Sequence, residues 1–393
     1  MTSSNMGGNL MKRFLLREER GGTGFLFDRK TGKAEAVLPQ GLAAYRASAD
    51  VDSLPLLELT PSHARIAPFC VWVELTRACN LKCPYCGAPN QGASSSLPAA
   101  QIAEMFQQFA QCGVFEVRLT GGEPTLHPEF SKIVDAAARI GLFVSVNSNG
   151  VLPDSDLGRF ASLPIGLYVI SLDGPKQVHN ALRPPDSYDK AVETVRVLIE
   201  NGKRVRINAV LCQANRDCLA PFVVALESLG VEALTLVPLR PAGLAKKTFD
   251  SMKLSRDEYA AVLRQLGELR RSHNLEIAAS YDLMSQGKIF NTPGHFAKRC
   301  VAGVEAACVG PGGDLRACIL LDARPYVVGN LLREPFSQLW ADDKRWGIFR
   351  EESRLPTRCQ TCGFFSTRCP GQCQVMAEHF GAAAVDPYCQ LLS

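Results

Sequence analysis

The sequence predicts an α/β fold: a partial (β/α)6 parallel barrel, an N-terminal β-hairpin element and a small irregular C-terminal cysteine-rich domain. Three observations predict it. Six short β-branched or aromatic runs alternate with helix-length segments between residues 71 and 238. Regular periodicity fades after Cys300, and eight of the 15 cysteines lie from there to Cys389. Apolar strands separated by helices indicate a parallel sheet of right-handed βαβ units.

The predicted strands span residues 71–76, 115–120, 142–147, 167–171, 204–211 and 233–238. The clearest helix lies at 188–199, where apolar residues recur at three- and four-residue spacing and Asn201-Gly202 forms a stop signal. Six units are too few to close an eight-stranded barrel, so we expect an open, curved one. Ligands of such barrels gather at the carboxyl ends of the strands, so the chemical motifs should follow strands directly.

The chain divides into four predicted parts. Residues 1–70 form an N-terminal element in which runs at 24–27 and 34–38 flank a turn and form a hairpin. Residues 71–250 form the barrel, and 251–299 form a bridging segment with an amphipathic helix at 255–272. Residues 300–393 form the cysteine-rich domain, which has little apolar core, so we expect metal ligation to fold it.

The composition excludes several classes of protein. A hydrophobic fraction of 46% and a charged fraction of 21% are ordinary for a globular enzyme. No apolar run reaches the roughly 18 residues of a membrane span, and the N-terminus shows no secretory signal, so we expect a cytoplasmic protein. The net charge is +4, but the basic residues are scattered, which argues against a nucleic-acid partner.

The cysteines carry most of the functional information. Fifteen is an odd number, and a chain without a signal peptide is not expected to form a disulfide scaffold. Eleven of them fall into two groups, one at residues 79–86 and one at 300–389. Clustered cysteines in a reducing compartment are more often metal ligands or catalytic thiols. Cys70, Cys112, Cys212 and Cys218 lie outside the groups and are expected to be packing thiols.

The first motif, Cys79-x3-Cys83-x2-Cys86, follows the first predicted strand. Three thiolates within eight residues can wrap one face of a four-iron cube and leave one iron without a protein ligand. An open metal position is where an outside molecule binds. The alternatives are a zinc site that lacks a ligand, or buried packing cysteines. The position directly after a strand favours an iron–sulfur cluster.

With the aromatic Tyr85 before its last cysteine, this motif resembles the signature of the radical S-adenosylmethionine (SAM) superfamily. The resemblance implies that the methionine amine and carboxylate of SAM chelate the open iron. It also implies that reductive cleavage of SAM yields a 5′-deoxyadenosyl radical, which abstracts a hydrogen atom from the substrate. Tyr85 should then lie near the adenine.

The second motif, Thr120-Gly121-Gly122-Glu123-Pro124, follows the second predicted strand. Glycines let the backbone approach a ligand closely, and Glu123 offers an acceptor for an ammonium group. Gly-Gly turns are common, but at this strand end the motif matches the methionine-amine site of the superfamily. Gly121, Gly122 and Glu123 are therefore predicted to bind SAM.

Polar residues also follow the third and fourth strands, at 147–150 and at 171–174. They suit ribose hydroxyls and a carboxylate, although Asn-Gly and Asp-Gly are also favoured turn dipeptides. The resemblance makes Ser171 and Arg183 contacts of SAM. For Asn149, which we include among the predicted SAM contacts, and for Asp173, a contact and a turn residue remain alternatives.

Seven C-terminal cysteines, with Gly313-x4-Cys318 and a Cys-x2-Cys-x6-Cys-x3-Cys run, resemble the auxiliary-cluster domain called SPASM. They are Cys300, Cys318, Cys359, Cys362, Cys369, Cys373 and Cys389. The six-residue spacer between Cys362 and Cys369 departs from the usual five, and a one-residue loop insertion is tolerable. Taken alone, Cys359-x2-Cys362 also fits a zinc ribbon.

Cys308 raises the count in this domain to eight, which matches two fully ligated four-iron clusters. The resemblance implies the following ligand sets: Cys300, Cys308, Cys318 and Cys373 for the first, and Cys359, Cys362, Cys369 and Cys389 for the second. Without Cys308 the first would keep an open iron. The predicted cofactors are therefore three [4Fe–4S] clusters and SAM.

Enzymes with this arrangement often modify ribosomally made peptides or proteins, by cross-linking, oxidising or epimerising them. We therefore expect a peptide-modifying radical SAM oxidoreductase or maturase, served by a flavodoxin- or ferredoxin-type electron donor. The alternatives are tailoring of a small molecule or tetrapyrrole, such as oxidative decarboxylation, and a non-catalytic iron–sulfur electron-transfer or sensor protein. An electron carrier would need no SAM pocket.

Two questions stay open at this level. The N-terminal hairpin either binds a leader peptide by strand addition or caps the barrel. No catalytic acid or base stands out, because His127, His179 and His379 lack partner spacing and are expected at turns or on the surface.

Overall fold

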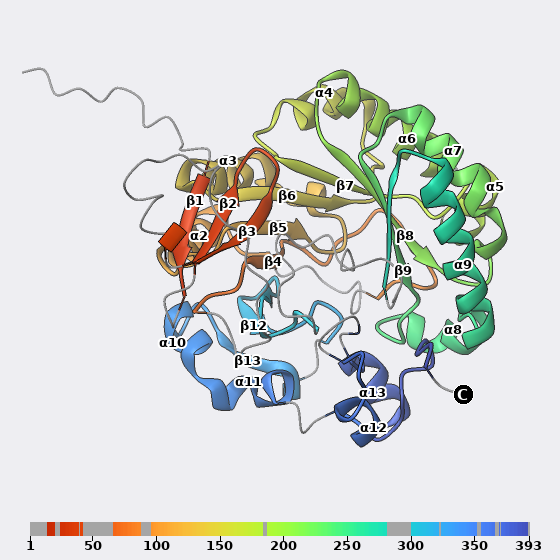
Figure 1. Cartoon of the computed structure of the whole chain (residues 1–393). Helices are drawn as coiled ribbons and strands as arrows, with labels where there is room; N and C mark the ends of the chain where they lie inside the picture. Colours follow the sequence, from red (N-terminus) through yellow and green to blue (C-terminus); the bar gives the residue numbers. More distant parts are fainter. Residues whose placement is uncertain are drawn as a thin grey trace, which may run out of the picture.

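The computed structural model describes residues 14–19, 24–38, 40–41, 66–87, 96–183, 187–280, 300–321, 324–351, 355–365, 369 and 371–391. A ten-stranded sheet curls into an open barrel with helices on its outer side (Figure 1). Parts of the predicted N-terminal element (1–13, 20–23, 39 and 42–65) and of the bridging segment (281–299) lie outside the described residues.

The barrel contains all six predicted strands, each within two residues of its predicted bounds. They are β4 (Cys70–Glu74), β5 (Glu116–Thr120), β6 (Phe143–Ser148), β7 (Leu167–Ser171), β8 (Val205–Leu211) and β9 (Ala233–Pro238). All neighbouring pairs among them are parallel. The predicted α/β partial barrel is confirmed.

Helices link the strands and cover the outside of the sheet. They are α2 (Ala99–Gln111), α3 (Phe130–Ile140), α4 (Asp154–Ser162), α5 (Lys176–Leu182), α6 (Ser187–Glu200), α7 (Leu219–Leu229) and α8 (Ala245–Met252), with 3-10 turns η1 (Pro124–Leu126) and η2 (Arg216–Cys218). Helix α6 is the helix predicted at 188–199. The chain leaves it through Gly202, whose positive φ of 68° suits glycine.

The segment after α8 continues the sheet. Helix α9 (Arg256–Ser272) begins at a capping box, in which Ser255 and Glu258 each accept the other's backbone N–H. Strand β10 (Glu276–Ala279) follows and pairs in parallel with β9. The described part of the predicted bridging segment is therefore built into the barrel.

Alternate residues of each strand face opposite sides of the sheet. On β5, Val117 and Leu119 belong to the large apolar core beneath the helices. Glu116 and Arg118 therefore face the inside of the barrel, where both contact Ser145 of β6. Thus β5 and β6 present apolar side chains to the helices outside and polar side chains to the inside of the barrel.

The cysteine-rich region is joined to the barrel by the same sheet. Strand β11 (Ala306–Val309) pairs in parallel with β4, and β12 (Asp314–Arg316) and β13 (Val327–Asn330) follow antiparallel. The remaining elements are η3 (Arg324–Tyr326), α10 (Phe336–Ala341), α11 (Asp343–Arg350), α12 (Thr357–Gln360) and α13 (Gln374–Phe380). These three strands were not predicted.

The expectation that this region has little apolar core is wrong. Phe336, Leu339 and Trp340 of α10 and Trp346 and Phe349 of α11 are at most 3% exposed and belong to the large core. Their helical spacing is interrupted by the cap at the junction of two short helices, so no long periodic stretch marks them in the sequence.

The described residues of the N-terminal element form a three-stranded antiparallel sheet, ordered β1 (Phe14–Glu18), β2 (Gly24–Asp28) and β3 (Lys33–Val37). The predicted hairpin is confirmed as β2–β3, and β1 is an addition. Phe25 and Phe27 pack against Phe69, Phe115 and Phe143, which lie where β4, β5 and β6 begin. The small sheet therefore covers the amino ends of the barrel strands, opposite the ends where the motifs lie.

Two arginines fix the small sheet to the barrel. Arg17 of β1 donates to the carbonyl of Gly113 at 2.9 Å, and its guanidinium lies over the ring of Phe69. Arg204, just before β8, donates to the carbonyl of Thr31 at 2.7 Å. No helix in the described part of the chain has the length and apolar character that crossing a membrane requires.

Candidate active site

The loop that follows β4 holds the first cysteine motif. The thiolates of Cys79, Cys83 and Cys86 are close enough to influence one another electrostatically. Burial raises the pKa of Cys83 to about 11, and the other two thiolates add to the shift while Arg183 opposes it. The loop therefore brings three thiols together, and a bound metal ion would favour their deprotonated form.

Gly121 and Gly122 are required by the chain's own packing. A Cβ on Gly121 would lie 2.3 Å from the carbonyl oxygen of Thr76, and one on Gly122 would lie 2.2 Å from that of Ala78. The amide of Gly122 donates to Thr76 at 2.8 Å, and that of Glu123 donates to Ala78 at 2.8 Å. We expected the two glycines to let the backbone approach a ligand. In this structure they let it approach the cysteine loop.

Glu123 is buried, and its carboxylate accepts hydrogen bonds from its own chain. One oxygen accepts from the hydroxyls of Thr125 and Ser148, at 2.8 and 2.9 Å, and the other accepts from the amide of Asn149 at 2.8 Å. Burial raises the pKa of Glu123, and these hydrogen bonds oppose that shift. Binding of an ammonium group by Glu123 remains a prediction. In the structure its carboxylate holds the end of β6 through Ser148 and Asn149.

Asn149 joins that strand end to the cysteine loop. Its Nδ2 donates to Oδ1 of Asn80 at 2.7 Å and lies 3.9 Å from Sγ of Cys79, while its Oδ1 accepts from the amide of Val151. Asn149 therefore forms a turn and contacts the cysteine loop, and its contact with SAM remains a prediction.

Asp173 is the centre of a buried network at the carboxyl ends of β7 and β8. Its Oδ2 accepts from the Tyr85 hydroxyl and from Nε of Arg183 at 2.7 Å, and its Oδ1 accepts from the amide of Val210 at 2.9 Å. Burial alone would raise the pKa of Asp173, but Arg183 and these donors hold it below its usual value. The carboxylate is therefore charged and fixes Tyr85 and Arg183 together.

Two members of this network were missed in the sequence. His179 is fully buried, and its Nδ1 accepts from the amide of Asp173 at 3.2 Å. Asn215 donates to the carbonyl of Asp173 at 2.8 Å. The spacing Asp173-x5-His179-x3-Arg183 places His179 and Arg183 one helical turn apart. This spacing is the feature of the sequence from which the position of His179 could have been predicted.

His127 lies at the end of the 3-10 turn η1, as expected for a turn residue, whereas the expectation that His179 lies at a turn or on the surface is wrong, because it lies within α5. They are 3% and 0% exposed, and both rings are held by hydrogen bonds to neighbouring segments. His379 is exposed, as expected.

Ser171 ends β7 and faces the lumen beside Asn208, its register partner on β8. On β6, Asn147 also faces inward, because its neighbours Val146 and Ser148 are buried on the other side. Within the described residues, Oδ1 of Asn147 and Oδ1 of Asn208 are buried and have no hydrogen-bond partner. The lumen thus offers acceptors to a bound molecule.

The C-terminal cysteines form two groups. In the first, Cys318 interacts electrostatically with Cys373, Cys300 and Cys308. Burial raises the pKa of Cys318 to about 12, and Cys373 and Cys300 contribute in the same direction. Burial also raises the pKa of Cys308, and Cys318 adds to that shift. Cys308 thus belongs to the same neighbourhood as the three cysteines with which it was grouped.

The second group lies closer to the surface. Cys369 interacts with Cys389, Cys359 and Cys362, and burial raises its pKa to about 12. Across the described chain, no three Cys, His, Asp or Glu side chains converge on a single-ion position. Three or four thiols are the donor set of an iron–sulfur cube.

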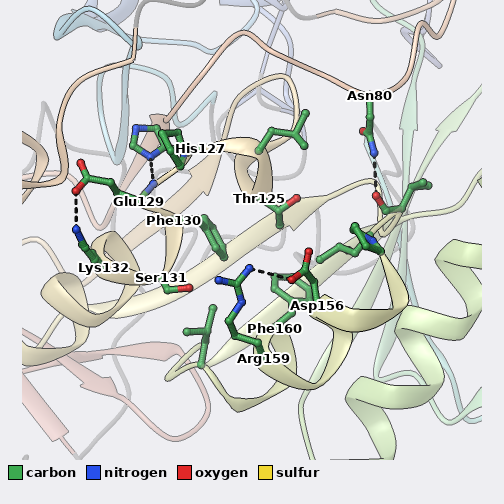
Figure 2. Close-up of a pocket in the computed structure, with 16 residues that line it drawn as sticks. Asn80, Thr125, His127, Glu129, Phe130, Ser131, Lys132, Asp156, Arg159 and Phe160 are labelled. Carbon is green, nitrogen blue, oxygen red and sulfur yellow. Dashed lines mark hydrogen bonds and ion pairs between the residues drawn. The ribbon is translucent and has the colours of Figure 1, made fainter.

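A cavity of about 520 Å³ lies behind the cysteine loop, between η1, the start of α3 and α4 (Figure 2). Asn80 forms part of its wall and donates to the carbonyl of Val151. Its basic side chains are paired, Lys132 with Glu129 and Arg159 with Asp156. The predicted SAM contacts are not among its lining residues, so this cavity is distinct from the candidate active site.

Two family models match the chain. The model of the radical SAM superfamily matches residues 73–219, and that of the SPASM iron–sulfur cluster-binding domain matches residues 300–363. The first contains the cysteine loop and the Asp173 network. The second contains five of the eight C-terminal cysteines, and Cys369, Cys373 and Cys389 lie beyond it.

The chain is also similar to characterised relatives. It is 29% identical over 337 residues to mycofactocin maturase MftC of Mycolicibacterium smegmatis, and this alignment covers 81% of each chain. It is 24% identical over 332 residues to the PqqA peptide cyclase of Ruegeria pomeroyi, covering 82% of this chain and 87% of the relative.

Solved structures share the fold. SuiB of Streptococcus suis, bound to its precursor peptide SuiA, aligns with a TM-score of 0.77 at 18% identity and covers 96% of this chain and 99% of SuiB. Native anSMEcpe with bound AdoMet aligns with a TM-score of 0.67 at 18% identity, and the alignment covers 82% of this chain and 94% of that one.

Proposed function

Because the chain is a radical SAM enzyme with a SPASM domain, we propose that it modifies a ribosomally made peptide. These domains imply [4Fe–4S] clusters and SAM as cofactors. The observation that carries the proposal is similarity over four fifths of the chain to two kinds of peptide-modifying enzyme, a maturase and a peptide cyclase.

The thiol groups support three clusters. Cys79, Cys83 and Cys86 would hold the one that binds SAM, because three thiols leave one iron of a cube free. Cys300, Cys308, Cys318 and Cys373 would hold a second, and Cys359, Cys362, Cys369 and Cys389 would hold a third. In the described structure, thiols of the same set interact electrostatically with one another.

When bound at the first set, the cluster and SAM supply a 5′-deoxyadenosyl radical, which abstracts a hydrogen atom from the substrate. The protein's own contribution is positioning. Asp173 fixes Arg183 so that its remaining guanidinium donors can bind the carboxylate of SAM. Tyr85 is held beside it, and Glu123 and Asn149 hold the strand end that touches the cysteine loop. The other predicted SAM contacts, Gly121, Gly122 and Ser171, complete this side of the site.

The lumen supports a peptide as substrate. Asn147 and Asn208 present carbonyl oxygens that need donors, and a peptide backbone supplies N–H groups at regular spacing. A buried acceptor without a partner costs about 1–3 kcal/mol, which a bound substrate would recover.

The test is co-expression under anaerobic conditions with any short precursor peptide encoded beside the gene. We expect a defined mass change in the peptide, and formation of 5′-deoxyadenosine and methionine in vitro with reduced flavodoxin or ferredoxin as the electron donor. A peptide that stays unmodified while a small molecule or tetrapyrrole is turned over would reject the proposal.

The metal content is tested separately. Anaerobically reconstituted protein should contain about 12 iron atoms per chain, four for each cube. A value near four, or zinc in place of iron, would reject the assignment of the C-terminal cysteines.

A further inference from the structure

Arg316 connects the cysteine-rich domain to the barrel across three neighbouring strands. It lies on β12 directly opposite Cys308 of β11, and Cys308 lies beside Trp72 of β4. From there its guanidinium forms an ion pair with Glu74, the last residue of β4. The same nitrogen, Nη2, donates to Sγ of Cys308 at 3.6 Å. Arg316, Cys308 and Glu74 are all at most 4% exposed.

We propose that Arg316 sets the reduction potential of the iron–sulfur cluster held by Cys308. The inference rests on the proposed cluster assignment. A thiolate-bound cluster becomes more negative when it gains an electron. A positive charge and a hydrogen bond at one sulfur therefore stabilise the reduced form more than the oxidised form, and they raise the potential. Burial strengthens this effect, because charges interact more strongly where water is excluded.

Glu74 has the opposite electrostatic effect. Its carboxylate orients Arg316 and also offsets part of its charge at the sulfur. Removing the arginine leaves a negative charge near the cluster, which lowers the potential. Removing the carboxylate charge leaves the arginine uncompensated, which raises it. A side chain that served only for packing would not give shifts of opposite sign.

The ion pair also ties the two thiol neighbourhoods together. Glu74 ends β4, and the chain then enters the loop that carries Cys79. The next amide, that of Leu75, donates to Thr120 at 2.9 Å, beside the glycine motif. Arg316 therefore reaches from the environment of one cluster to the strand that supports the other.

The experiment is a redox titration followed by electron paramagnetic resonance on the anaerobically reconstituted full chain. The variants are Arg316→Gln, Arg316→Lys and Glu74→Gln. The auxiliary signals are identified in a chain with Cys79, Cys83 and Cys86 all replaced by Ala. Arg350→Gln is the matched control, because Arg350 is a buried arginine of the same domain that donates to the carbonyls of Gly303 and Trp340.

At a poise near the midpoint, Arg316→Gln should lower the reduced-to-oxidised ratio of one auxiliary cluster at least tenfold, about 59 mV for one electron. Glu74→Gln should shift it the other way, Arg316→Lys should stay near the wild type, and Arg350→Gln should leave it unchanged.

Unchanged potentials in Arg316→Gln and Glu74→Gln at full iron content, or shifts of the same sign, would overturn the inference. If Arg316→Gln loses the cluster, the potential measured in Glu74→Gln decides, because this variant keeps the arginine; a potential that is not raised would then overturn the inference. Iron near four per chain would overturn both this inference and the cluster assignment. Shifted potentials with no peptide modification would reject only the proposed substrate.

Discussion

Asp173 and Arg183 form a buried ion pair, with Nε of Arg183 2.7 Å from Oδ2 of Asp173, and the arginine also lies 5.7 Å from the ring centroid of Tyr85. We predict that Asp173→Asn weakens SAM binding about tenfold or more, because a charge-assisted hydrogen bond that orients the arginine is lost. Equilibrium dialysis against SAM measures this directly.

The matched control is Asp189→Asn, which removes the carboxylate of an exposed ion pair with Lys176. It should leave SAM affinity unchanged. Full iron content together with wild-type affinity in Asp173→Asn would show that Arg183 needs no help from the carboxylate.

Gly122 allows the glycine motif and the cysteine loop to touch. Gly122→Ala places a Cβ 2.2 Å from the backbone oxygen of Ala78, so the loop must move. We expect the variant to lose the cluster of that loop, which lowers iron by about four atoms per chain. Iron analysis after reconstitution checks this.

Gly158 offers a control of the same chemical change. It lies in α4, and an added Cβ meets nothing within 4 Å. Gly158→Ala should keep all of its iron and gain up to about 1 kcal/mol in stability, because alanine favours the helix. If Gly122→Ala also kept all of its iron, the contact would not be needed for metal binding.

His179 makes stability depend on pH. Burial, followed by the nearby charge of Arg183, lowers its pKa to about 4 in the folded chain, against about 6.5 when unfolded. Below pH 6.5 the unfolded state therefore binds a proton more readily than the folded state. The contribution of neutral, buried His179 to the unfolding free energy is fully present above pH 6.5, and it is lost as the pH falls toward 4. In His179→Gln the contribution is absent.

The unfolding free energy of the wild type, minus that of His179→Gln, should fall by about 2 kcal/mol between pH 7.5 and pH 5. Anaerobic denaturant titrations at several pH values measure the difference. A difference that stays constant over this range would mean that the histidine titrates equally in both states.

The sequence was sufficient to predict the six parallel strands β4 to β9, because each one is a short apolar run between helices. The grouping of Cys308 with Cys300, Cys318 and Cys373 came from the resemblance to the SPASM domain; in the structure Cys318 interacts with the other three, and their role as one ligand set stays a prediction. Strand β11 was missed because it pairs with β4, which lies more than 200 positions earlier in the chain, and β12 and β13 extend the sheet from it. Short strands of three or four residues leave no period to count.

The network around Asp173 could be predicted only in part. Asp-Gly is a common turn dipeptide, so Asp173 alone gave no preference between a turn and a contact. What distinguishes it is burial, together with donors from three other segments at Tyr85, Arg183 and Val210. Such convergence depends on tertiary packing, which local patterns do not record.

Phe27 tests what the N-terminal sheet does. Its ring is fully buried and stacks on Phe115, with the centroids 4.9 Å apart. If the sheet caps the barrel, Phe27→Ala should cost about 3–5 kcal/mol of unfolding free energy, because it leaves a cavity at the amino ends of β4 to β6. Val224→Ala on α7, where the side chain is 51% exposed, should cost little and serves as the control. A loss below about 1 kcal/mol in Phe27→Ala, with weaker peptide binding, would favour a recognition role over a cap.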